Sequence, residues 1–157
     1  MADSAPGWRE QYDRMLRWHA RIREATHVDD QFVDGSYALF TCCFHVKDWL
    51  KADVAVPQEI RNLVEEYVER NLWLRFSADL ANGSKHMILD RPRFDKPARV
   101  EKIGVLDLSP LAIMPVKPGA VIQIGTASYH PHHVADRCVA QWNTFLVEHG
   151  LTTETTG

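Results

Sequence analysis

The residues with the clearest chemical potential lie in the stretch Asp79-Leu-Ala-Asn-Gly-Ser-Lys-His86. On a helix, Asp79, Asn82 and His86 stand at positions i, i+3 and i+7, so they share one face. The His86 imidazole on that face could act as a general acid or base, and Lys85 could supply positive charge to a phosphate. The stretch therefore indicates a candidate site for hydrolysis or transesterification of a phosphodiester.

A second polar group lies upstream, where His45 and Asp48 are i, i+3 neighbours on another predicted helix. If the two helices pack side by side, Asp48 or Asp79 could orient an imidazole and set its tautomer. The interpretation assigns His86, Asn82, Asp79 and Lys85 to catalysis, and His45, Asp48 and Arg75 to binding. Two alternatives stay open for the same residues: a divalent metal site, and a polar network that only fixes the packing of the helices.

The length and composition bound the class of protein. The chain has 157 residues, of which 45% are hydrophobic and 25% charged, as expected for one globular domain. We predict a single domain over residues 1–157, with loose tails at 1–6 and 151–157. A net charge of −3 excludes a global basic field for nucleic acid or an anionic membrane, although a local basic patch is compatible with it.

The cysteines and the hydropathy indicate a compartment. Cys42, Cys43 and Cys138 are odd in number and show no zinc-site spacing, so we predict three reduced, buried thiols. The polar N-terminus has no signal-like apolar region, and no apolar run is long enough to cross a bilayer. These features predict a cytoplasmic protein with no membrane partner and no cofactor.

The apolar periodicity predicts a mainly α fold: a four- or five-helix bundle with an antiparallel β-hairpin inserted before the last helix. The predicted helices run from Trp8 to about Ala25, from about Gln31 to Lys51, from Pro57 to about Asn71, from there to about Leu89, and from Pro131 to Gly150. The β-branched segment 98–127 predicts the hairpin. Phe40, Phe44 and Trp49 widen the apolar surface of the second helix, which predicts that it is central in the bundle.

Two further groups of residues admit a functional reading beside an ordinary one. The first helix has a basic face, which we interpret as solvated, with contact to phosphates as the alternative. Its members are Arg9, Arg14, Arg17, Arg21 and Arg23. His130, His132 and His133 form a cluster of a kind that can bind metal, but we interpret them as a solvated loop before the last helix.

The segments Cys43-Phe-His-Val-Lys-Asp-Trp-Leu50 and Asp79–His86 resemble a family of uncharacterised bacterial helical proteins with an Asp-x-x-Asn-x-x-Lys-His motif. More distantly, they are similar to the HEPN superfamily. The resemblance implies a helical bundle that often dimerises, acting on RNA or a nucleotide, in many cases as a metal-independent ribonuclease in defence or toxin–antitoxin systems. Asn82 and His86 match the polar residue and the histidine of the HEPN signature, whereas Ala81 stands at the position of its arginine. The alternative is a non-catalytic helical interaction module with a structural polar network.

Overall fold

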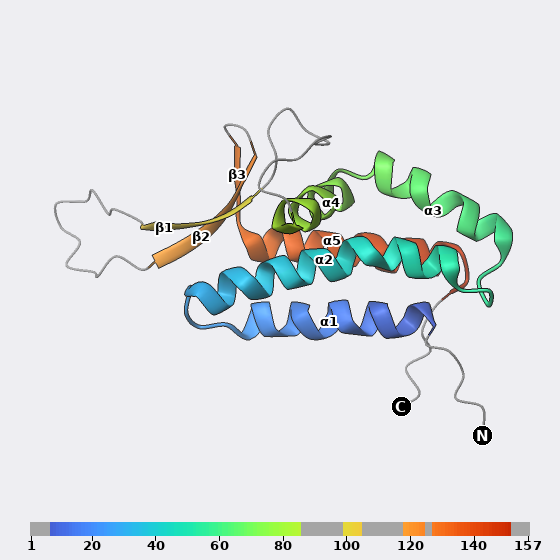
Figure 1. Cartoon of the computed structure of the whole chain (residues 1–157), viewed down its shortest axis with the longest axis horizontal. Coiled ribbons are helices and arrows are strands. Elements are labelled where there is room, and N and C mark those ends of the chain that lie inside the picture. The colour runs from blue at the N-terminus through green and yellow to red at the C-terminus, as the bar shows by residue number, and fades with distance from the viewer. Residues whose placement is uncertain (1–6, 86–98, 105–117, 125–126, 152–157) are drawn as a thin grey trace, which may run out of the picture.

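The computed structural model describes residues 7–85, 99–104, 118–124 and 127–151, and it confirms the predicted fold class (Figure 1). Its helices are α1 (Trp8–Glu24), α2 (Asp30–Ala52), α3 (Gln58–Arg70), α4 (Leu72–Lys85) and α5 (Pro131–Glu148). The strands β1 (Arg99–Gly104), β2 (Pro118–Ile124) and β3 (Ala127–Tyr129) form one antiparallel sheet in the order β1-β2-β3. The sheet precedes α5 in the chain, as predicted, but it has three strands in place of two.

The ends of the helices follow from a few side chains. The carboxylate of Asp29 accepts a hydrogen bond from the Phe32 backbone N–H at 2.9 Å and so caps α2. The Asn71 side chain caps α4 in the same way, and Pro131 occupies the first turn of α5. Gly150 ends α5 with a φ of 66°, a conformation that favours glycine.

Leu151, the first residue of the predicted C-terminal tail, is attached to the bundle. The Leu151 backbone N–H donates to the Leu146 carbonyl at 2.8 Å, and its side chain packs against the core. The predicted end of the fourth helix near Leu89 lies outside the described residues, as do the segments 1–6 and 152–157.

Helix α2 is central, as its apolar surface predicted. It packs against each of the other four helices and against β1, and Phe40 and Cys43 on it are fully buried. Across the core, the Trp142 indole N–H of α5 donates to the Cys43 carbonyl at 2.9 Å. The Tyr37 hydroxyl of α2 accepts from the Val100 backbone N–H at 3.1 Å, so the sheet is attached at the end of the bundle where α1 turns into α2 (Figure 1).

The three cysteines are free and buried, as predicted. Burial raises the pKa of the Cys42 thiol, and burial together with the neighbouring Cys43 raises the pKa of Cys138 well above its ordinary value. The raised pKa makes the Cys42 and Cys138 thiols poor nucleophiles. All three cysteines pack in the hydrophobic core. None of the helices in the described ranges combines the length and the apolar character needed to cross a membrane.

Candidate functional site

Helix α4 carries the candidate catalytic motif and packs against α2, α3, α5 and β1. Asp79 has an exposed fraction of 0%, and Asn82, one turn further along, is half-buried. A buried carboxylate is costly unless it is paired or hydrogen-bonded, and Asp79 does have an interacting partner. On the face of α4 that the sequence predicted to be polar, Asp79 therefore lies in the protein interior and Asn82 lies at the edge of the buried region.

The end of the motif falls at the limit of the described chain. Lys85 is the last described residue of α4, and His86 lies outside the described residues. The joint placement of Asp79, Asn82 and His86 on one face accordingly stays a prediction. Arg75, one turn before Asp79, is half-buried and has an interacting partner.

The two candidates on α2 differ in exposure. His45 is half-buried, and its ring centroid lies 6.1 Å from that of Phe44. Asp48 is exposed and accepts a hydrogen bond from Lys47 at 2.7 Å. Lys47, which was not a sequence-based candidate, is only 8% exposed and also lies 3.6 Å from Glu65 of α3. Asp48 therefore belongs to a network of charges that joins α2 to α3.

This network gives a prediction about acid stability. The hydrogen bond from Lys51, at 2.8 Å, lowers the pKa of Glu65 against the opposing effect of its partial burial. A group with a lowered folded-state pKa contributes stability above its unfolded-state pKa, and the contribution is lost as the pH falls through the folded-state pKa. Glu65→Gln should therefore destabilise the protein by less than about 1 kcal/mol at neutral pH, because the pair is largely exposed.

Urea unfolding across a pH series measures this difference. The gap between wild type and Glu65→Gln should narrow as the pH drops below the ordinary range of a glutamate. Glu66→Gln is the matched control, since it removes only an i,i+4 pair with Arg70 on the surface of α3. A gap that stays constant down to low pH would contradict the assigned role of Glu65.

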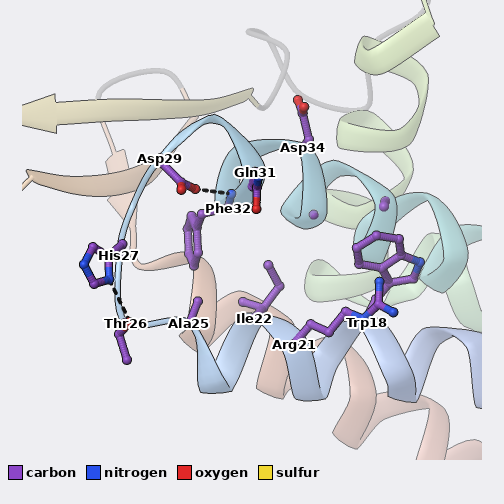
Figure 2. Close-up of a pocket in the computed structure, with 12 residues that line it drawn as sticks. Trp18, Arg21, Ile22, Ala25, Thr26, His27, Asp29, Gln31, Phe32 and Asp34 are labelled. Carbon is purple, nitrogen blue, oxygen red and sulfur yellow. Dashed lines mark hydrogen bonds between the residues drawn. The ribbon is translucent and has the colours of Figure 1, made fainter.

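A groove of about 750 Å³ lies where α1 turns into α2. Figure 2 shows Trp18 and Arg21 of α1 on one side of it and Phe32 of α2 on the other, with the Asp34 carboxylate directed away from α1. The Arg21 guanidinium lies over the Trp18 ring, 4.8 Å from its centroid. Such a groove offers aromatic surface, the Arg21 cation and the polar side chain of Gln31 to a ligand. It was not predicted, since it depends on how two helices meet.

Three arginines of α1, including Arg21, lie over aromatic rings. Arg9 lies over Trp8 at 4.8 Å, and Arg14 lies over Trp49 of α2 at 5.8 Å. Arg14 is also paired with Glu10 at 2.9 Å. Arg9, Arg17, Arg21 and Arg23 are exposed. The basic face of this helix is thus solvated, as interpreted, and it leads into the groove at Arg21.

The histidine cluster is more ordered than the predicted loop. The Nδ1 atoms of His130 and His132 are 3.2 Å apart, and Nε2 of His132 is 2.9 Å from the Ile22 carbonyl oxygen. His133 packs its ring against Trp73 at 5.3 Å. Partial burial, and then the neighbouring His132 and His133, lower the pKa of His130. His132 therefore joins the start of α5 to the end of α1, and His130 is linked to it through the Nδ1 contact.

A second imidazole binds the same part of α5. Nε2 of His19 lies 2.7 Å from Asp136, which also lies 3.6 Å from Arg23. Within the ranges that the structure describes, no three histidine, cysteine or acidic side chains come together closely enough to hold a metal ion. Comparison of the chain with models of protein families, with curated proteins and with solved structures gave no match.

Proposed function

We propose that this protein acts on RNA or a nucleotide, as a HEPN-like protein that cleaves a phosphodiester without a metal. In this proposal His86 transfers the proton, Asn82 and Lys85 contact the phosphate, and Asp79 orients the site from within α4. The observation that carries it is the complete burial of the Asp79 carboxylate one turn before a half-buried Asn82. A carboxylate fixed beneath a polar surface position is what an oriented acid–base group needs.

The groove at the turn between α1 and α2 supports the choice of RNA or a nucleotide. Its volume of about 750 Å³ lies within the range of small-molecule sites. Single-stranded bases stack on aromatic side chains and on arginine planes, and both are present at Trp18 and Arg21. The side-chain amide of Gln31, which also lines the groove, could form hydrogen bonds with the edge of a base.

Binding of single-stranded RNA should depend on the basic face of α1. Each phosphate contact contributes about 0.7 to the slope of log affinity against log salt for a single strand. Replacing Arg17 and Arg21 together with alanine should weaken binding and make this slope shallower by up to about twice that amount. Fluorescence anisotropy of a labelled oligonucleotide over a salt series measures both quantities.

The matched control is Arg70→Ala, which removes an exposed arginine from α3, on another part of the bundle. It should leave the affinity and the salt dependence close to those of wild type. An equal loss of affinity in the control and in the double variant would mean that RNA is attracted by the overall distribution of charge and not by the basic face of α1. Unchanged binding in the double variant would remove the basic face from the proposal.

One observation favours the non-catalytic alternative. Ala81, at the position of the HEPN arginine, is 1% exposed and packed in the interior. A catalytic cation at that point of the helix is therefore replaced by core packing. In this second proposal Asp79 and Asn82 belong to a structural network, and the protein binds a partner without cleaving it. Tight binding of RNA without turnover would favour this alternative.

A further inference from the structure

We propose that His130 and His132 form a binding site for a transition-metal ion, such as Zn²⁺, Ni²⁺ or Cu²⁺, which both residues coordinate through Nδ1. The site lies at the start of α5, on a different helix from the candidate catalytic motif. It is independent of the proposed function on RNA.

The distance between the two nitrogens fits a chelate. In a tetrahedral zinc site with Zn–N bonds of about 2.0–2.1 Å, two nitrogen ligands lie roughly 3.3–3.4 Å apart. The Nδ1 atoms of His130 and His132 are 3.2 Å apart. Their ring centroids are separated by 4.9 Å and their planes by 34°, so the rings lie at an angle to each other, as two ligands of one ion do.

The tautomer of His132 is fixed in the form that a metal requires. A backbone carbonyl only accepts, so Nε2 of His132 must carry the hydrogen that it donates to Ile22 at 2.9 Å. The neutral ring then has its lone pair on Nδ1, the atom that faces His130. Metal-binding histidines commonly donate their second N–H to a carbonyl in this manner, which orients the ring and makes the ligand more basic.

Packing also holds the His132 ring in place. Its centroid lies 5.4 Å from that of Phe32 on α2, so the ring is held between α1 and α2 at its position on α5. His130 is exposed, and an ion can reach the pair from that side. Without a metal, one Nδ1 donates to the other; the ion would replace that single hydrogen.

The surroundings limit the affinity. The positive end of the α5 dipole disfavours a divalent cation, at a cost of roughly five- to thirtyfold in affinity. Asp136, one turn further along α5, is engaged with His19 and Arg23 and so does not act as a third ligand. Two protein ligands leave the other coordination positions to water, which agrees with the absence of any three-residue metal cluster in the described residues.

Titration of the full chain, without a histidine tag, with Zn²⁺ in a calorimeter tests the site. His130→Ala and His132→Ala should each lower the affinity by at least about tenfold, since loss of a mere supporting residue already costs 10- to 100-fold. His27→Ala is the matched control, because His27 is another exposed histidine, hydrogen-bonded to Thr26. It should bind Zn²⁺ like wild type. Wild-type affinity in a folded His130→Ala variant would overturn the proposal.

Imidazole ¹⁵N chemical shifts identify the coordinating atom. On addition of Zn²⁺, the Nδ1 signals of both His130 and His132 should move, while Nε2 of His132 stays protonated. Because this measurement uses wild type, it does not depend on whether His132→Ala folds. Coordination through Nε2 of scattered histidines, with no change at these two Nδ1 atoms, would show surface binding only and would overturn the site.

Discussion

Replacing Trp142 with alanine is expected to lower the free energy of unfolding by about 3–5 kcal/mol. The side chain is 0% exposed and packs edge-on against Phe145, with ring centroids 6.0 Å apart. Its indole N–H also donates the hydrogen bond that links α5 to the Cys43 carbonyl in the middle of α2. Alanine would leave a large cavity at the point where the last helix meets the central one. Urea or thermal unfolding measures the change.

Two further variants separate the causes of that loss. Trp142→Phe keeps most of the ring but removes the N–H donor, so it should lose about 1 kcal/mol for the hydrogen bond and a smaller cavity term. Trp49→Ala is the matched control, because Trp49 is a half-buried tryptophan of α2. It should destabilise the protein less than Trp142→Ala. Equal losses at the two tryptophans would mean that α5 is not anchored to α2 in the way described.

Features that depend on local sequence were predictable. The wide apolar surface of the second helix predicted its central position, and the structure packs every other helix against it. Pro131 and Gly150 predicted the limits of α5 because one fits a first helical turn and the other a left-handed cap. These signals act over one or two helical turns, so the amino-acid sequence is enough to recognise them.

Features that depend on distant contacts were not predictable. Strand β3 has three residues, too few to show alternation, and it forms only by pairing with β2. The pairing of His132 with the Ile22 carbonyl joins positions 110 residues apart, so a reading of the histidine cluster as a solvated loop missed it. The groove beside Trp18 exists only because α1 and α2 meet at a sharp turn.

The candidate site shows the same division. Helical spacing predicted a shared face for Asp79 and Asn82, but it did not say that Asp79 would be fully buried. Likewise, spacing grouped His45 with Asp48, but it did not indicate that Asp48 accepts a hydrogen bond from the neighbouring Lys47. A lysine with a long aliphatic stem can lie along apolar surface and still reach a carboxylate, which spacing rules do not represent.

Replacing His86 with alanine is expected to lower the rate of RNA cleavage by about 100- to 10,000-fold, the usual contribution of a general acid or base. In the proposed reaction the ribose 2′-hydroxyl attacks the adjacent phosphorus and loses its proton to a base. The bond from phosphorus to the 5′-oxygen breaks, and that oxygen takes up a proton. The products are a 2′,3′-cyclic phosphate and a free 5′-hydroxyl. Ala81 in place of the signature arginine removes one stabilising charge, so the wild-type rate itself should be low.

The assay compares wild type, His86→Ala and a control on single-stranded RNA, each with and without EDTA. The control is His149→Ala, which removes a half-buried histidine at the end of α5, outside the groove between α1 and α2. We expect wild type and the control to cleave the RNA both with and without EDTA, and the products to carry 2′,3′-cyclic phosphate ends. Loss of cleavage in EDTA would replace the proton-transfer mechanism with a metal-dependent one. Equal cleavage by His86→Ala would assign the activity to a contaminant. If wild type binds RNA without cleaving it, Asp79 and Asn82 are parts of a structural network. The reason is that a buried carboxylate without a proton-transfer partner can only orient its neighbours.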